Sequence, residues 1–317
     1  MPRVPMLFPG QGSQTVGMAA DLLAAGGSAA RFLRSVNDTV GCDLLGIMTA
    51  GPDDVLTETR NAQPALLAHS VAVTLALADR GIQPSLVAGH SLGEFSAAVA
   101  CSALDPGDAL RTVRRRGELM FAAGREIPGT MAAVMGLPLA TVAAVCAGVD
   151  GVVVPANHNS DTQVVISGEV AAVAAAGEAL KAAGAKRVTP LNVSGAFHSP
   201  LLADAAAAFR EFLGTIPVHD PAVPLIANVD AEPVTTAAAL REGFARQLTS
   251  PVLWHGIMER LCGDPARPRL VLEVGPGKVL GGLARRAYPD VTFVPVGTVA
   301  DLEGLPALLA AAASGHG

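Results

Sequence analysis

The chain has 317 residues and half of them are hydrophobic, which is enough to bury one large core, or a large core and a second small one. Aromatic residues are scarce and Ala, Val and Leu abundant, a composition typical of helices packed on a sheet of aliphatic strands. The net charge of -6 argues against a nucleic-acid binder, which is usually basic.

The first residues are predicted to form a β-strand. Residues 1–8 hold too short an apolar stretch before Pro9-Gly10 to be a signal peptide, so export is not expected. The cysteines are widely spaced without a C-x-x-C pair, which favours reduced, buried thiols over disulfides or a metal site. They are Cys42, Cys101, Cys146 and Cys262. These features predict a cytoplasmic protein.

A glycine-rich turn, residues 9–13, follows this strand, and a helical pattern then runs to about Ala25. The turn lacks the Lys-Ser/Thr ending of a phosphate-binding loop. Gly12 would suit a close approach of backbone, so the segment is either an ordinary turn or a donor of N–H groups to an oxyanion. A second helical region is predicted near residues 64–77.

The pentapeptide Gly89-His90-Ser91-Leu92-Gly93 has the pattern of a nucleophile elbow, between a strand-like run at 86–88 and a helix-like run at 94–103. A serine hydroxyl is a poor nucleophile until it stands exposed beside a base. A sharp turn from strand to helix exposes it and aims backbone N–H groups at the developing oxyanion. Both glycines are expected to be required, because neighbouring chain packs close to the turn. Ser91 is therefore predicted to be a nucleophile.

Three consecutive arginines, Arg114, Arg115 and Arg116, lie on a helix predicted to begin near Pro106. Consecutive helical positions point to different faces, so at most one of them faces a cleft and the others form a solvated basic face. A buried arginine opposite the nucleophile would pair bidentately with a carboxylate. It would then select an acyl group that carries a free carboxylate.

The uncharged stretch at residues 130–149 approaches the length of a membrane span. It is rich in Ala and interrupted by Gly136 and Pro138, so a strand, a turn and a helix explain it better. No association with a membrane is predicted.

Between about residues 124 and 193 the pattern becomes self-contained, with the order βαββαβ. The predicted elements are a strand at 131–137, a helix at 139–147, strands at 152–155 and 163–167, a helix at 170–183 and a strand at 187–192. This is the split βαβ, ferredoxin-like arrangement, whose ends lie close together and so allow insertion into a larger domain.

We therefore predict an α/β fold in two parts. A small subdomain of residues 126–196 is inserted into a large subdomain of residues 1–125 and 197–317, whose strands resume at 224–228 and 270–274. Strands that alternate with helices in the large part predict a mainly parallel sheet. The elbow would lie at the carboxyl edge of that sheet, where open α/β folds place their sites.

A serine nucleophile needs a base, and the most suggestive histidine is His198, at the junction where the inserted unit returns to the main sheet. A hydrogen-bonded structural histidine is the alternative at this place. His90 is beside the serine, but adjacent residues on a tight turn point apart, so it is interpreted as structural. No acidic residue stands out as a third triad member; Asp150, Asp161 and Asp230 stay open, and a backbone carbonyl could orient the imidazole instead.

At this point the chain resembles the malonyl-CoA:acyl-carrier-protein transacylases and, more broadly, the acyltransferases of fatty-acid and polyketide synthesis. The resemblance runs from Phe8 to about Leu283 and is carried by seven motifs in order. They are FPGQGSQ at 8–14, AGHSLGE at 88–94, Arg116-Gly117 with Met120, Asn159 with QVVISG at 163–168, GAFHS at 195–199, Gln247-Leu248 with Pro251-Val252 and Trp254, and EVGPG at 273–277.

The resemblance implies an α/β-hydrolase-like large subdomain with a ferredoxin-like small one, and it assigns roles to individual residues. It implies Ser91 as the nucleophile and His198 as the base. It implies the backbone N–H groups of Gln11 and Leu92 as the oxyanion hole, and Arg116 as the partner of the malonyl carboxylate. In this family a main-chain carbonyl at the position of Gln247 orients the imidazole, which would explain the missing acid.

The implied activity is a ping-pong transfer of a malonyl group from malonyl-CoA, through a seryl ester, to the phosphopantetheine thiol of an acyl carrier protein. Neither a bound cofactor nor a metal is expected. Phe197 favours malonyl over methylmalonyl, because a bulky ring leaves little room for an α-methyl group. An acidic carrier needs a basic patch, for which Lys181, Lys186 and Arg187 are the first candidates and Arg111 and Arg115 the rivals.

The same residues are compatible with other activities. The enzyme could transfer another extender unit, methylmalonyl or an unusual acyl group. It could also be a serine hydrolase of acyl thioesters, although such an enzyme has no use for a carboxylate clamp. A non-catalytic docking subunit is disfavoured because every nucleophilic part is present.

Overall fold

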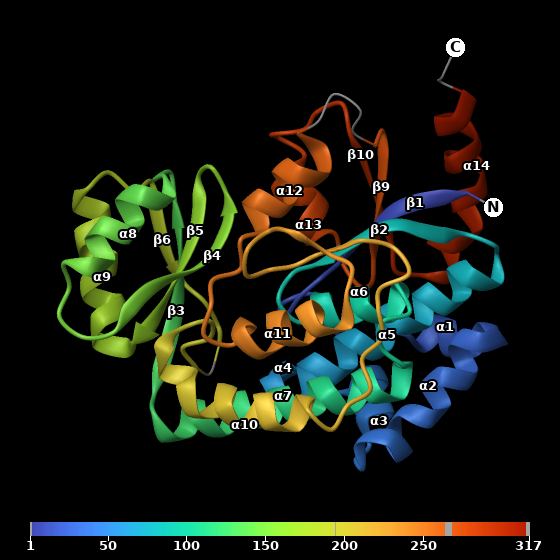
Figure 1. The fold of residues 1–317 in the computed structure, drawn as a ribbon, viewed down its shortest axis with the longest axis horizontal. Coiled ribbons are helices and arrows are strands. Elements are labelled where there is room, and N and C mark those ends of the chain that lie inside the picture. The colour runs from blue at the N-terminus through green and yellow to red at the C-terminus, as the bar shows by residue number, and fades with distance from the viewer. Residues whose placement is uncertain (1, 194, 264–267, 315–317) are drawn as a thin grey trace.

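The computed structural model describes residues 2–193, 195–263 and 268–314, and within them the chain forms two sheets (Figure 1). The larger sheet has six strands in the order β10 (Thr292–Val296), β9 (Leu270–Val274), β1 (Arg3–Phe8), β2 (Gln83–Gly89), β7 (Leu225–Ile226) and β8 (Pro233–Val234). All neighbours in it are parallel except the pair β7 and β8. The predicted parallel sheet is confirmed.

Helices cover both faces of the large sheet. They are α1 (Ala20–Ala25), α2 (Gly27–Val40), α3 (Leu44–Ala50), α4 (Asp53–Thr57), α5 (Thr59–Asp79), α6 (Gly93–Ala100), α7 (Pro106–Glu126), the 3₁₀ turn η1 (Pro200–Leu202), α10 (Ala203–Leu213), α11 (Ala237–Gln247), α12 (Trp254–Cys262), α13 (Val279–Ala284) and α14 (Val299–Ser314). Alternate residues of β1 point to opposite faces. Met6 and Phe8 therefore pack in the main core with α5 to α7, and Leu7 packs in a second core with α12 and α13.

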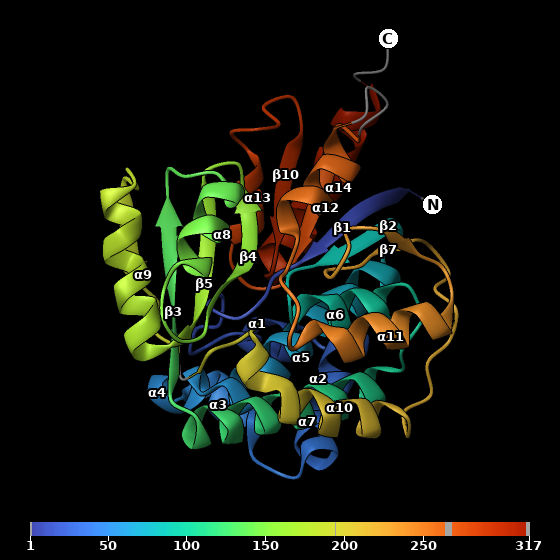
Figure 2. The same cartoon turned by 60° about the vertical axis from the view of Figure 1, so that its left-hand side comes forward.

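The smaller sheet is antiparallel, in the order β4 (Val153–Ser160), β5 (Gln163–Glu169), β3 (Gly129–Met135) and β6 (Arg187–Pro190). Helices α8 (Leu139–Ala147) and α9 (Val170–Ala182) close its own core. This is the predicted βαββαβ order, so the ferredoxin-like unit is confirmed. Figure 2 shows it standing beside the large sheet. The exact boundaries at 125/126 and 196/197 stay predictions.

The two parts meet along the edge strand β4. Asn157 forms a β-bridge with Val252. The N–H of His158 donates to the carbonyl of Val252 at 2.9 Å, and the N–H of Val252 donates to the carbonyl of Ala156 at 2.9 Å. This backbone connection fixes the small subdomain beside the carboxyl edge of the large sheet. Strand order reverses at β1, which lies between β2 and β9, and ligand sites of open α/β sheets form at such a switch point.

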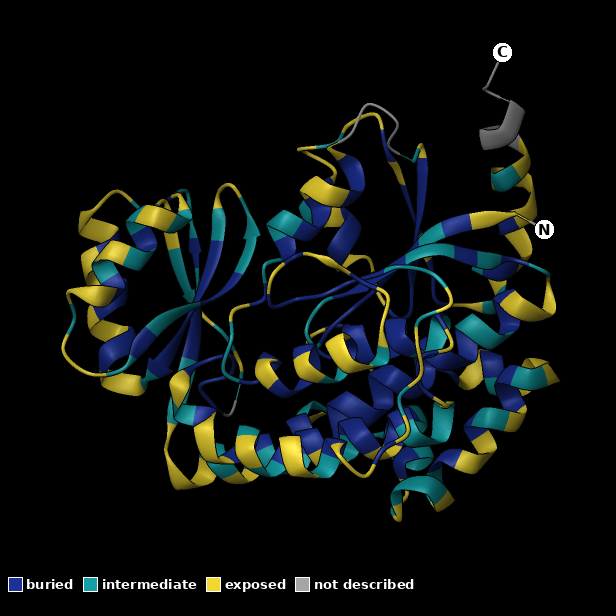
Figure 3. Cartoon of the chain, in the orientation of Figure 1, coloured by how far each residue is buried: buried dark blue, intermediate teal, exposed yellow. Residues whose placement is uncertain are grey.

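Helix α5 is the central helix of the large subdomain and is buried along most of its length (Figure 3). Pro64 lies inside it and has no N–H to give to the carbonyl of Arg60, four residues earlier. Nη1 of Arg114 donates to that carbonyl at 2.9 Å. A side chain from α7 therefore satisfies the acceptor that the proline leaves open, and α5 continues without a break.

Two expectations from the sequence need correction. The helical pattern after the first turn gives a helix only at α1, because Gly12, Gly17 and Ala19 have positive φ angles of 101°, 94° and 65°, which keep residues 12–19 out of a helix. In that turn it is Gly10 and not Gly12 that makes the close approach: a Cβ on Gly10 would lie 2.5 Å from the carbonyl oxygen of His90, whereas nothing lies within 4 Å of one on Gly12.

Candidate active site

Ser91 lies at the turn between β2 and α6, with a left-handed φ of 50°. Its N–H donates to Oδ1 of Asn228 at 2.7 Å, and Nδ2 of Asn228 donates to the carbonyl of Gly89 at 2.7 Å. A left-handed backbone is costly for a serine and persists where its surroundings hold it. Asn228 thus stabilises the turn through hydrogen bonds to both Ser91 and Gly89, a role that the sequence analysis did not predict.

Both glycines of the elbow are in contact with backbone that could not move aside. A Cβ on Gly89 would lie 2.0 Å from the carbonyl carbon of Gly93, and one on Gly93 would lie 2.1 Å from the carbonyl oxygen of Phe8. The elbow is thus locked against the end of β1. The predicted need for both glycines is confirmed.

His198 lies on the segment that returns from the small subdomain, and its Nε2 is 2.7 Å from Oγ of Ser91. Its Nδ1 faces two backbone carbonyls, of Gln247 at 2.9 Å and of Ser250 at 3.2 Å. Because carbonyl oxygens only accept, Nδ1 carries the proton and the lone pair of Nε2 accepts the hydroxyl of Ser91. Gln247 is the last residue of α11, where carbonyls have no partner within the helix.

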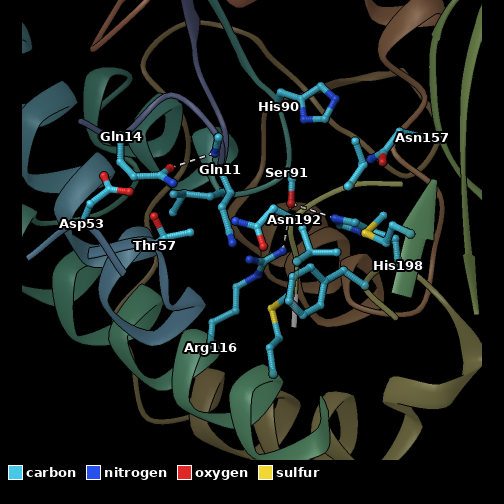
Figure 4. A pocket seen from close by; sticks show the side chains of 17 residues that line it. Gln11, Gln14, Asp53, Thr57, His90, Ser91, Arg116, Asn157, Asn192 and His198 are labelled. Carbon is cyan, nitrogen blue, oxygen red and sulfur yellow. Dashed lines mark hydrogen bonds between the residues drawn. The ribbon is translucent and has the colours of Figure 1, made fainter. Parts of the chain in front are cut away.

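The carbonyls of Gln247 and Ser250 occupy the place that an acid would take in a triad. The three aspartates left open lie elsewhere: Asp150 is exposed between α8 and β4, Asp161 faces His255 at 3.1 Å, and Asp230 accepts the N–H of Glu232. His90 is bound through Nε2 to Oδ1 of Asn159 at 2.9 Å. Its ring turns away from the pair of Ser91 and His198 (Figure 4).

Arg116 is the one arginine of its triplet that is buried, and it comes from the face of α7 that packs on α5. Nη2 donates to Oγ of Ser91 at 3.1 Å and to Oε1 of Gln247 at 2.8 Å, and Nη1 donates to Oε1 of Gln63 at 2.6 Å. Gly117 permits this closeness, because a Cβ there would lie 2.8 Å from the backbone of Arg60.

A chain of hydrogen bonds leads from Arg116 to the glycine-rich turn. Gln63 uses its Nε2 to donate to Oγ1 of Thr59 at 2.9 Å, and Thr59 donates to Oε1 of Gln11 at 2.9 Å. The N–H groups of Gln11 and Leu92 have no acceptor among the residues that the structure describes. Both residues line the cavity beside Ser91, so these N–H groups are available to an oxyanion.

The cavity has a volume of about 450 Å³ and opens between the two subdomains (Figure 4). The polar side chains of Gln14, Asp53 and Thr57 lie together on one side of it (Figure 4), and Phe197 is one of its apolar lining residues. The other apolar lining residues are Leu92, Met120, Met131, Leu191 and Val193. A cavity of this size, with a few polar groups converging on one hydroxyl, is typical of a small-molecule site.

Burial governs the electrostatics of the site. Burial and the neighbouring Arg116 lower the pKa of His198 to about 3, so its imidazole is neutral and ready to accept a proton at neutral pH. Burial also lowers the pKa of Arg116 to about 10, opposed by Glu94, and the guanidinium stays charged. The cavity therefore offers one positive charge next to a nucleophile and a neutral base.

The predicted residues Ser91, His198, Arg116, Phe197, Gln11 and Leu92 all line this cavity, and Gln247 contributes its carbonyl from behind. The sequence analysis did not predict the residues that form hydrogen bonds to Arg116, Gln247, Ser91 and His198. They are Gln63, Glu94, Asn228 and Ser250, respectively. Within the described residues there is no group of three His, Cys, Asp or Glu that could hold a metal ion. No helix in the same part of the chain has both the length and the apolar character to span a membrane.

Comparison with known proteins agrees with this geometry. Residues 6–302 match the model of the acyl transferase domain family. The chain is 42% identical over 295 residues to the malonyl CoA-acyl carrier protein transacylase of Escherichia coli strain K12, covering 92% of this chain and 95% of that one. It is 38% identical to the protein of the same name from Staphylococcus aureus strain COL, covering 96% and 98%.

Solved structures give the same result. A malonyl-transacylase in complex with its type II PKS acyl carrier protein superposes with a TM-score of 0.91 at 40% identity, covering 95% of this chain and 98% of that one. An acyl carrier protein S-malonyltransferase from Vibrio cholerae superposes with a TM-score of 0.90 at 39% identity, covering 95% and 99%.

Proposed function

Since this chain belongs to the acyl transferase domain family, we propose that it moves a malonyl group from malonyl-CoA, through an ester on Ser91, to the phosphopantetheine thiol of an acyl carrier protein. Relatives about 40% identical over nearly the whole chain carry the malonyl transacylase name, and one of them is bound to its carrier protein. The product serves fatty-acid or polyketide synthesis.

The observation that carries this proposal is the buried guanidinium of Arg116 beside Oγ of Ser91, 3.1 Å away. A buried charge is costly unless it is paired. The carboxylate of a malonyl group would supply the partner and would match the planar fork of the arginine. Holding that carboxylate also fixes the thioester carbonyl against the nucleophile.

In the first half-reaction the hydroxyl proton of Ser91 passes to Nε2 of His198 while Oγ attacks the thioester carbon. The resulting oxyanion receives hydrogen bonds from the N–H groups of Gln11 and Leu92. The bond from carbon to sulfur then breaks, and the imidazolium returns its proton to the leaving CoA thiolate. An ester of Ser91 remains.

In the second half-reaction the phosphopantetheine thiol of the carrier gives its proton to Nε2 of His198 and attacks the ester carbon. Oγ of Ser91 leaves and takes that proton back, so the enzyme is regenerated. Throughout, the carbonyls of Gln247 and Ser250 keep Nδ1 protonated, so that Nε2 alone exchanges the proton.

Phe197 supports malonyl as the acyl group. The residue is buried, its ring lines the cavity, and it directly precedes His198. An α-methyl group on the acyl chain would compete with the ring for space, although one such contact discriminates by only about 10 to 200-fold. Transfer of methylmalonyl or another extender unit is the second candidate.

Hydrolysis of an acyl thioester would use the same Ser91 and His198. It would not need Arg116, a buried positive charge that the side chains of Gln63 and Gln247 hold beside the nucleophile. We also infer a cytoplasmic enzyme whose substrate-binding residues are Arg116, Phe197 and Gln247; the free thiols of Cys42, Cys101 and Cys146 agree with a reducing compartment.

The test is the intact mass of the protein after brief incubation with malonyl-CoA, methylmalonyl-CoA or acetyl-CoA. We expect a malonyl adduct that is absent in Ser91→Ala and disappears when holo carrier protein is added. Rapid loss of the adduct without a carrier would favour the hydrolase. A methylmalonyl adduct formed as fast as the malonyl one would overturn the preference assigned to Phe197.

A further inference from the structure

Glu94 is a buried carboxylate to which the proposed mechanism gives no task. It lies in the first turn of α6, three residues after Ser91, and is 1% exposed. One oxygen accepts the N–H of Asn228 at 3.2 Å, and the other accepts Nε2 of Gln247. A buried carboxylate costs free energy unless it is well paired, so its presence beside the nucleophile calls for a reason.

Glu94 contributes to fixing the orientation of the side-chain amide of Gln247. A carboxylate only accepts hydrogen bonds, so it faces the NH₂ end of that amide. The carbonyl end, Oε1, is then left for Nη2 of Arg116, 2.8 Å away. A reversed amide would put its NH₂ group against the guanidinium, donors against donors. Nε2 of Gln247 also donates to the carbonyl of Ser91 at 3.1 Å, which ties the amide to the elbow.

We propose that Glu94 is a positioning residue for malonyl selectivity: through Gln247 it holds Nη2 of Arg116 beside Oγ of Ser91, where the carboxylate of the donor binds. This inference rests on the proposed function and assigns part of its specificity. An acyl group without a carboxylate gains nothing from the placement of that guanidinium. Glu94 should therefore discriminate between donors and not merely support all of them.

The charges around Glu94 lead to a dependence on pH. Burial raises the pKa of Glu94 to about 7; Arg116 of α7 opposes that rise, and Asp230, after β7, adds to it. His198, whose Nδ1 donates to the backbone carbonyl of Gln247 at 2.9 Å, is neutral. Only the ionised carboxylate enforces the amide orientation, since a protonated one offers a donor of its own. The preference for malonyl over acetyl is thus expected to increase as the pH rises through about 7.

The test is the ratio of malonyl to acetyl loading on Ser91 in Glu94→Gln, an isosteric change. Because both donors are measured on one preparation, the ratio does not depend on the folded fraction. We expect the ratio to fall about tenfold, the size of one hydrogen bond to a charged group, and to lose its rise near pH 7. An unchanged ratio, whether the two loading rates stay the same or fall equally, would overturn the inference and leave Glu94 as a support of the elbow.

Glu273 provides a matched control. It is also a carboxylate that is 1% exposed, with a pKa raised by burial, and it accepts the N–H groups of Leu280 and Gly281 at 2.9 and 2.8 Å. It makes these bonds to the start of α13, away from Arg116. Glu273→Gln should keep the malonyl to acetyl ratio of the wild type. A fall as large as that in Glu94→Gln would mean that loss of any buried carboxylate changes the ratio.

A double-mutant cycle tests the route through Gln247. If Glu94 acts through that amide, Glu94→Gln should change the ratio little once Gln247→Met has removed it. An equal drop in both backgrounds would contradict the inference. The failure of the proposed function is distinguishable: wild-type enzyme that accepts no malonyl group refutes both, whereas a normal malonyl adduct with an unchanged ratio in Glu94→Gln refutes this inference alone.

Discussion

At the scale of single residues, Arg116 is the test of substrate choice. Arg116→Ala should lower malonyl loading by about 100-fold or more relative to acetyl loading, because a charge-assisted pairing with the carboxylate is lost. The kinetics of acyl-enzyme formation with both donors measure this. Arg115→Ala is the control, since Arg115 is exposed on the same helix. Equal losses with the two donors would remove the selectivity assigned to Arg116.

His198 leads to a prediction about pH. Its pKa, lowered to about 3 by burial and by Arg116, lies far below the ordinary value of 6.5. A lowered histidine pKa means that the folded enzyme keeps the imidazole neutral well below pH 6.5. The rate of loading from acetyl-CoA, which avoids the donor carboxylate, should therefore show no inflection near pH 6.5. A decline with a midpoint there would contradict the neutral base that the burial of His198 implies.

Which site residues could be predicted depends on how local their signals are. Ser91 is recognised because its turn has a fixed pattern of glycines. The triplet shows only that at most one of its arginines faces a cleft, and the family resemblance identifies that one as Arg116. Gln63 and Asn228 act across gaps of 53 and 137 residues, so no spacing reports them. Glu94 did leave a signal, since it is the single charge in the apolar run that follows the elbow.

At the scale of elements, the elbow depends on contacts between backbones. Gly93→Ala would place a Cβ 2.1 Å from the carbonyl oxygen of Phe8, and neither β1 nor the turn can yield. We expect the free energy of unfolding to fall by about 3 kcal/mol or more, the upper range for overpacking. Denaturant unfolding measures it.

Gly282→Ala is the matched change for this prediction. Gly282 lies in α13, it is exposed, and nothing lies within 4 Å of an added Cβ. Alanine there should stabilise by about 0.5 to 1 kcal/mol through helix propensity. Similar stabilities for the two variants would show that the elbow tolerates a side chain at Gly93.

Elements whose ends depend on local sequence were predicted well, and those that depend on contacts with other elements were not. The strands and helices of the small subdomain follow one another with clear turns and a strict order, and α8 was predicted residue for residue. In the large subdomain α5 begins five residues earlier than the pattern indicated. The reason is tertiary: Pro64, in the second turn of α5, leaves the carbonyl of Arg60 without a helical donor, and Arg114 from α7 supplies one. Local propensity could not anticipate a partner on another helix.

At the scale of the whole molecule, the site exists only because two subdomains meet. The elbow and Arg116 come from the large one, and residues 191–193, which follow β6, line the cavity from the other side. The backbone connection of β4 to Val252 holds these walls together. In the proposed reaction a carrier protein delivers its thiol into this gap, so we expect it to contact both subdomains.

The overall charge of -6 would repel an acidic carrier, so a local positive patch has to guide it. Lys186 and Arg187 are exposed at the start of β6, the strand that leads to the cavity wall, whereas Lys181 is paired with Glu178 at 2.7 Å and Arg111 with Asp108 at 2.6 Å. Lys186 and Arg187 are therefore the cations of this set that we expect to act on the carrier, and Lys186 is the one that the next experiment changes.

Lys186→Glu should lower the second-order rate of transfer to holo carrier protein and weaken its dependence on salt, because electrostatic guidance acts on association and is screened by ions. Loading of Ser91 from malonyl-CoA should be unchanged, since Lys186 does not line the cavity. Arg115→Glu, on the exposed face of α7, is the rival in the same assay. If Lys186→Glu leaves both the rate and its salt dependence as in the wild type while Arg115→Glu reduces them, the carrier docks against α7 and not against β6.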